Sequence, residues 1–156
     1  MKRSDFLEKW GLSSLKLNIG FLNAEFKPDD ADRAAAWDLY IELLTRVTTQ
    51  NLPVEHGDEK TALDSVFVMF SLTREILRKH GPSNEFAKLA IPVLNQVIRP
   101  FTAKWHKLSL ASAFQDSVKC QEFRAELALL QPRLRHYTQA LSAMAGVEDL
   151  TTLEQA

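Results

Sequence analysis

Much of the chain spaces its apolar residues three and four apart, the pattern of an amphipathic helix. The segment 90–106 shows this pattern most clearly, with apolar positions Val93, Leu94, Val97, Ile98 and Phe101. These positions share one helical face, so we expect this segment to lie in the middle of the core. Each of its two prolines lacks a backbone donor and disfavours helix at the preceding residue. The sequence therefore predicts a kink near Pro92 and a break at Arg99.

Capping residues and terminators predict further helices on both sides of this segment. One expected helix runs from the aspartates at 29–32 to Asn51, and a second runs from Asp58 to His80 with Phe67 and Phe70 on its inner face. A third runs from Ser83 into the proline segment. A fourth begins at a capping box formed by Ser112 and Gln115 and continues to or through Pro132. A last set of apolar residues with helical spacing predicts a helix that ends at Gly146. Because the connections are short, neighbouring helices should run antiparallel. The pattern predicts an all-α fold, an antiparallel bundle of about five main helices over residues 29–146.

The first 28 residues follow a different pattern. Residues 5–10 predict a short helix, and residues 15–21 then alternate apolar with polar or small residues, the two-residue period of an extended segment. Residues 23–28 are expected to form a turn, so no second strand is evident. We therefore expect an extended N-terminal arm that wraps the helices or pairs with the same arm of another subunit. Residues 147–156 should form one amphipathic turn or fray.

Composition limits the class of protein. With 156 residues, of which 46 % are apolar, the chain suits a single domain, residues 1–156, with a substantial core. The only cysteine, Cys120, permits no internal disulfide and favours a reducing, cytoplasmic location. The four histidines lack paired ligand spacing and the five glycines form no nucleotide-binding loop, so we expect no metal and no cofactor. A charged N-terminus and the lack of a long apolar run predict no membrane insertion.

Charge is unevenly distributed although the net charge is −1. Residues 22–64 contain ten acids and four bases, whereas residues 65–136 contain eleven bases and five acids. No acid occurs between Glu85 and Asp116, although that window contains Lys88, Arg99, Lys104 and Lys107. Such a window favours contact with an anion, which could be a phosphate, a nucleic acid or the acidic segment of a second copy. The alternative is a solvated face with an uneven charge count.

The first group of candidate binding residues is Arg99, Lys104 and His106, which lie within a few residues of the last expected core position, Phe101. Their place in the sequence predicts that they stand at the opening of the core, where a phosphate-bearing ligand could reach them.

The second group is Arg46, Thr49 and Gln50, in the last turns of the helix expected at 29–51. These side chains could bind an anion or cap the last carbonyls of the helix. If the bundle brings Arg46 near Arg99, the two would form a cationic pocket for a phosphate or a nucleotide.

An arginine is followed at a short distance by a histidine in two places, Arg74 with His80 and Arg99 with His106. Both spacings resemble the R-x(4–6)-H motif of HEPN ribonucleases, which are small helical bundles. The resemblance implies a histidine that activates the ribose 2′-hydroxyl and an arginine that holds the phosphate. That family usually has a polar residue directly after the arginine, and here Pro100 follows Arg99. For both pairs, the alternative is a group of cations near a helix end.

The segments AAWDLYIELLTRVTTQ and VLNQVIRPFTAKWH resemble bacterial proteins without an assigned chemistry, some of which occur among defence-related genes. This resemblance implies a bacterial origin and a role in anti-phage defence.

Two functional hypotheses follow from the sequence. The first is a non-enzymatic, homo-oligomeric helical module that binds a protein partner or a nucleotide-like, phosphate-bearing ligand through the two groups of candidate residues. The second is a metal-independent ribonuclease of HEPN type that acts on RNA.

Overall fold

The protein is essentially all-α, as the periodicity predicts. The computed structural model describes residues 15–18, 22–46, 48–53 and 58–151. The helices in this part of the chain are α2 (Asp30–Leu44), α3 (Glu59–Phe67), α4 (Met69–His80), α5 (Asn84–Val93), α6 (Arg99–Leu110) and α7 (Ser117–Ala145), with a π-helical turn at Leu94–Ile98 and a 3-10 turn at Ala113–Gln115. The short helix expected at residues 5–10 lies outside the described residues.

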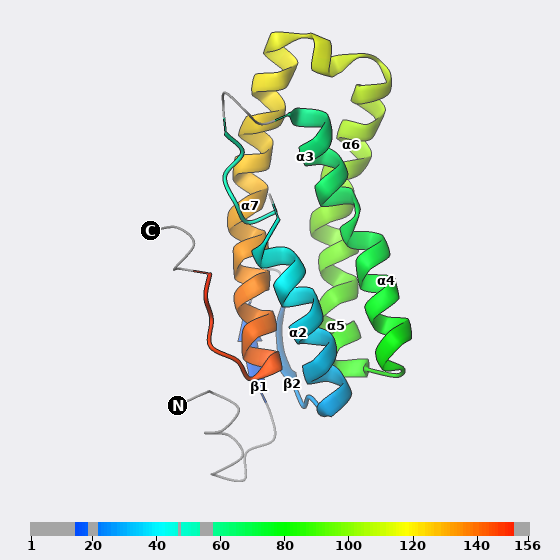
Figure 1. The fold of residues 1–156 in the computed structure, drawn as a ribbon, viewed down its shortest axis with the longest axis vertical. Coiled ribbons are helices and arrows are strands. Elements are labelled where there is room, and N and C mark those ends of the chain that lie inside the picture. Colours follow the sequence, from blue (N-terminus) through cyan, green and yellow to red (C-terminus); the bar gives the residue numbers. More distant parts are fainter. Residues whose placement is uncertain (1–14, 19–21, 47, 54–57, 152–156) are drawn as a thin grey trace.

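The helices form antiparallel rods that run up and down the long axis of the molecule (Figure 1). α3 and α4 follow each other almost in line, and α5, the π-helical turn and α6 form one continuous rod (Figure 1). α7 is the longest helix, with 29 residues, and it packs along α2. The antiparallel order follows from the short connections, which leave each helix only enough chain to turn back along its predecessor.

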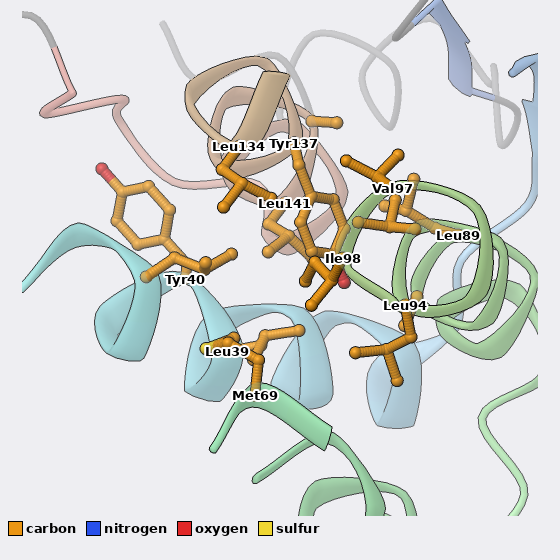
Figure 2. Close-up of a cluster of buried hydrophobic side chains, with 14 of the residues drawn as sticks. Leu39, Tyr40, Met69, Leu89, Leu94, Val97, Ile98, Leu134, Tyr137 and Leu141 are labelled. Atoms are coloured by element: carbon orange, nitrogen blue, oxygen red, sulfur yellow. The ribbon is translucent and has the colours of Figure 1, made fainter. Parts of the chain in front are cut away.

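The core lies where α2, α4, the α5–α6 rod and α7 meet, and Figure 2 shows its central side chains. The cluster includes Leu39 and Tyr40 from α2, Met69 from α4, Leu89, Leu94, Val97 and Ile98 from the rod, and Leu134, Tyr137 and Leu141 from α7. The central position predicted for the proline-containing segment is therefore confirmed.

The break predicted at Arg99 is wrong, because the chain stays helical from Asn84 to Leu110. A π-helical turn at Leu94–Ile98 immediately precedes Arg99, whose N–H donates to the carbonyl of Leu94, five residues earlier. A proline inside a regular α-helix collides with the carbonyl four residues before it. The wider π-helical turn relieves this collision for Pro100 without ending the helix.

α2 ends at Leu44, about two turns earlier than the sequence pattern predicts. The chain then folds back, and side chains of α7 bind the backbone of the returning segment. Gln131 donates to the carbonyl of Gln50 at 2.8 Å, and Arg135 donates to the carbonyl of Thr49 at 3.2 Å. These contacts from a distant part of the chain stabilise a turn that local periodicity does not reveal.

Two other predicted helix boundaries also change. The expected helix 58–80 is interrupted at Val68, although Asp58 caps its start and Gly81, with φ +69°, follows its end as predicted. Ser112 adopts a left-handed conformation and caps no α-helix. Asp116 instead caps α7 by accepting a hydrogen bond from the N–H of Val118 at 2.9 Å.

At the end of the bundle, the observed helix boundaries are closer to the predicted ones. α7 passes through Pro132 without starting a new helix, and it ends before Gly146, as predicted.

The N-terminal arm is not a lone extended segment, because it pairs with the residues expected to form a turn. β1 (Leu15–Asn18) and β2 (Asn23–Phe26) form an antiparallel hairpin with Leu15 opposite Phe26. Leu15, Leu17 and Phe26 are buried against the helices, whereas Lys16 is exposed. The predicted alternation is therefore confirmed for the described part of β1, but its strand partner lies within the same chain.

Residues 147–151 neither fray nor form a helical turn. The N–H of Leu150 donates to the hydroxyl of Tyr40 at 2.7 Å, and Thr151 is buried. This part of the expected tail is therefore held against α2.

One buried carboxylate, that of Asp32, joins the starts of two helices. It accepts a hydrogen bond from the N–H of Asp29 at the start of α2 and another from the N–H of Phe86 in the first turn of α5, each at 3.0 Å. Ser83, the predicted cap of α5, occupies the N-cap position, but its hydroxyl makes no capping bond. Asp32 therefore provides from α2 the acceptor that Ser83 does not provide.

Candidate functional site

Arg99 and His106 lie on the same face of α6, two helical turns apart, beside aromatic rings of α3 and α4. The Arg99 guanidinium lies 4.7 Å from the centre of the Phe70 ring. The His106 ring meets the Phe67 ring edge-on, with 4.5 Å between centroids. His106 Nε2 is also 4.0 Å from an Asp64 carboxylate oxygen. We call these five residues the Arg99 face.

Sequence periodicity placed Phe67 and Phe70 together on the inner side of their helix. Phe70 is buried, but Phe67 is 48 % exposed. The Phe67 ring still packs against the Phe70 ring, with 5.7 Å between centroids, but it lies at the edge of the predicted inner face, where solvent reaches it. An exposed aromatic ring therefore lies beside the predicted cations.

The guanidinium of Arg99 is oriented but carries no neutralising acid. Its Nε and one terminal nitrogen donate to the Asn95 side-chain oxygen at 3.2 and 3.0 Å. Among the described residues, no carboxylate forms an ion pair with Arg99. A guanidinium has five N–H donors, so three remain for a ligand.

Lys104 points away from the Arg99 face. It follows Arg99 by five residues, which is about 140° around the helix axis. Its ammonium group forms ion pairs with Glu126 at 2.5 Å and Glu122 at 3.6 Å, both on α7. The hydrogen bond to Glu126 raises the pKa of Lys104 above its ordinary value. The acid-free window in the sequence is therefore not free of acids in space, because α7 supplies them.

Arg46, Thr49 and Gln50 lie where α2 ends and make contacts within their own segment. Arg46 forms a two-nitrogen contact with Glu42 at 3.0 and 2.9 Å. The Thr49 hydroxyl donates to the carbonyl of Leu43 at 2.7 Å, and the Gln50 amide donates to the carbonyl of Leu44 at 3.1 Å. Thr49 and Gln50 therefore cap carbonyls of α2, as the alternative predicts, whereas Arg46 pairs with a carboxylate one turn earlier. No contact between Arg46 and Arg99 joins the two groups of candidate residues.

The other arginine–histidine pair does not share a helical face. Arg74 and His80 are six residues apart on α4, about 120° around its axis. His80 Nε2 is 2.6 Å from an Asp38 oxygen of α2, and Lys79 binds the same oxygen at 3.2 Å. Arg74 is exposed, and it follows Phe70 by one helical turn, on the side of α4 next to the Arg99 face.

Asp38 belongs to a hollow of about 350 Å³ between α2 and α4. The hollow has an apolar floor and charged edges, lined by Asp38, Ile41, Glu42, Leu72, Glu75, Ile76 and Lys79. Burial raises the pKa of Asp38, but hydrogen bonds from His80 and Lys79 outweigh burial and hold the pKa below its ordinary value. The Asp38 carboxylate therefore stabilises the contact between α2 and α4 when it is ionised.

This lowered pKa predicts a dependence of stability on pH. Because folded Asp38 loses its proton more readily than unfolded Asp38, its contribution is complete above the unfolded pKa of about 3.9 and is lost as the pH falls through the folded pKa. We expect the free energy of unfolding to fall less in Asp38→Asn than in the wild type between about pH 5 and pH 2. Urea unfolding across this range measures the difference.

A matched control for this prediction is Asp30→Asn. Asp30 is fully exposed and pairs with Arg33 one turn later on the same helix. We expect Asp30→Asn to keep the wild-type pH dependence. Equal pH dependence in the wild type and in Asp38→Asn would contradict the role assigned to Asp38.

Comparisons with protein-family models, with curated proteins and with solved structures find no match for this chain. In the described part of the chain, no cluster of three or more histidine, cysteine or acidic side chains is arranged to hold a metal ion. None of the helices in the described ranges combines the length and apolar character needed to cross a bilayer.

Proposed function

We propose that this protein is a non-enzymatic helical module that binds a phosphate-bearing, nucleotide-like ligand on the Arg99 face. The carrying observation is the state of Arg99, which is exposed, held in orientation by Asn95 and Phe70, and not neutralised by a described acid. Arginine in such a state presents a planar set of donors to phosphate oxygens at little cost in side-chain entropy.

The neighbouring side chains suit the rest of a nucleotide. Phe67 offers a half-exposed ring on which a base can stack, and His106 adds a donor beside it. Arg74 adds a second exposed cation on the adjoining side of α4. Arg46 and Lys104 contribute less to this proposal, because each is already paired with glutamate.

A second candidate function is a HEPN-type ribonuclease, which the relation of Arg99 to His106 favours over the pair Arg74 and His80. The first pair lies on one helical face, and an Asp64 oxygen, bound by Lys60 at 2.8 Å, is 4.0 Å from His106 Nε2. This arrangement contains the base and the phosphate-binding cation that metal-independent RNA cleavage needs. A role in bacterial defence stays a prediction from the resemblance, and neither candidate depends on it.

A short fluorescein-labelled single-stranded RNA tests the proposed binding, with ATP as competitor. We expect Arg99→Ala to raise the Kd, read by fluorescence anisotropy, about tenfold, because it removes charge-assisted hydrogen bonds. Arg99→Lys keeps the charge but loses the planar stack on Phe70, so it should fall between the wild type and Arg99→Ala. Lys16→Ala removes an exposed cation of β1 and should bind like the wild type.

The same mixtures, containing EDTA and examined on a gel, separate the two candidate functions. Intact RNA with binding that depends on Arg99 supports the binding module. Cleavage that is lost in His106→Ala but kept in His80→Ala supports the ribonuclease. Equal binding by the wild type and Arg99→Ala, or no binding of RNA and ATP, would overturn the proposed binding site.

A further inference from the structure

The outer side of α7 carries apolar residues that nothing in the described structure covers. Val118 is 67 % exposed and Leu129 is 74 % exposed, and Ala125 between them is also exposed. These three residues are spaced by seven and four positions, so they fall on one side of the helix, opposite the buried positions Phe123 and Leu127. A stripe of exposed apolar residues on one side of a long helix favours a role for that side in an interaction.

A groove between α6 and α7 lies directly beside this stripe. Its volume is about 380 Å³, and it is lined by Val97, Pro100, Phe101, Lys104, Glu126, Leu129, Leu130 and Arg133. Apolar side chains form its walls and charged groups its edge. The surface therefore combines a projecting leucine, Leu129, with an adjacent groove that can accept an apolar side chain.

Two charged residues of opposite sign flank the stripe, one on each half of α7. Glu122 lies on its N-terminal half and Arg133 on its C-terminal half, each within about 40° of Leu129 around the helix axis. Glu122 is held by Lys119 and Lys104. Arg133 is exposed and forms no ion pair or hydrogen bond with any residue that the structure describes. Arg133 is therefore a cation at the edge of an apolar groove, available to an acid on a partner.

Residues of the stripe and its flanking charges form complementary pairs about nearly the same point on α7. Leu129 and Ala125 are a large and a small residue centred on position 127, and Glu122 and Arg133 are opposite charges centred between positions 127 and 128. A two-fold axis that crosses a helix pairs residues equally far from the crossing point. The centres of these two pairs lie half a residue apart, close enough for the single crossing point that an antiparallel pair of identical helices requires.

We propose that a second copy of this chain packs on α7 in an antiparallel, two-fold symmetric dimer. Leu129 of each copy covers Ala125 of the other and reaches its α6–α7 groove, and Arg133 of each copy pairs with Glu122 of the other. The small Ala125 allows the two helix axes to approach closely at the crossing point. This dimer goes beyond the proposed ligand binding, which uses the opposite, α3–α4 side of α6, and it leaves the Arg99 face open.

Solution mass measured by light scattering over a concentration series tests the dimer. We expect the wild type to approach twice the chain mass of 17.7 kDa, and Leu129→Glu to stay at the chain mass with an unchanged circular dichroism spectrum. Leu110→Glu is the matched control, because Leu110 is 89 % exposed at the end of α6, outside the stripe. A wild type that stays monomeric throughout, or a dimer that survives Leu129→Glu, would overturn the proposal.

Charge reversal tests the antiparallel arrangement. Arg133→Glu places two acids opposite each other at two symmetric positions, so we expect it to raise the dimer Kd about tenfold. Glu122→Arg should weaken the dimer similarly, and the double variant should restore it because the opposite charges face each other again. A double variant that is weaker than either single variant would show that these two residues do not meet across the interface.

Discussion

Replacing Asp32 with alanine is expected to lower the free energy of unfolding by about 3 kcal/mol, because one substitution removes the acceptor of two helix starts. The carboxylate is 2 % exposed and accepts hydrogen bonds from the N–H groups of Asp29 and Phe86. Without it, the buried N–H of Phe86 has no acceptor, and the N–H of Asp29 loses its partner at the more exposed start of α2. Urea unfolding followed by circular dichroism measures the change.

Two further variants separate capping from other effects of this substitution. Asp32→Asn keeps an acceptor oxygen for one of the two N–H groups, so we expect about half of the loss seen in Asp32→Ala. Asp30→Ala removes the neighbouring, exposed carboxylate of the same helical turn and should stay within about 0.5 kcal/mol of the wild type. A loss in Asp32→Ala as small as that in Asp30→Ala would show that the two bonds carry little stability.

Asp32 also shows what a single sequence reveals about helix boundaries. Its place among acids at the start of α2 predicts a local cap, and the structure contains that cap. Its bond to Phe86, 54 residues later, depends on how α2 and α5 pack, and no local pattern reports that packing. The same limit explains the missed hairpin, since Asn23–Phe26 becomes a strand by pairing with Leu15–Asn18.

Prediction of the candidate site has a similar limit. Residue types and spacing identify Arg99, Lys104 and His106 as basic side chains near a core helix, and all three lie on α6. Whether each cation is available to a ligand depends on acids from other helices. Lys104 is neutralised by α7, whereas no described acid pairs with Arg99. The sequence therefore indicates a cationic region, but only the packing shows which of its charges a ligand can use.

Trp105 is a core residue that the predicted core omitted, although it follows Phe101 by four positions and Ile98 by seven. It is fully buried, and its ring packs against Phe114 and Phe123 at centroid distances of 5.9 and 5.2 Å. We expect Trp105→Ala to lower the free energy of unfolding by about 4 kcal/mol, because it leaves a large cavity between α6 and α7. Urea unfolding followed by circular dichroism measures this loss without relying on tryptophan fluorescence.

Part of the expected loss in the free energy of unfolding comes from a hydrogen bond, and a second variant separates this part from the effect of the cavity. The indole N–H of Trp105 donates to Glu126, the same carboxylate that binds Lys104. Trp105→Phe removes this donor but keeps much of the ring, so we expect a loss of about 1.5 kcal/mol. Trp37→Ala is the matched control, because this tryptophan is 43 % exposed on α2 and should cost about 1 kcal/mol. If Trp105→Ala costs no more than Trp37→Ala, then the stability of the contact between α6 and α7 does not depend on the buried ring.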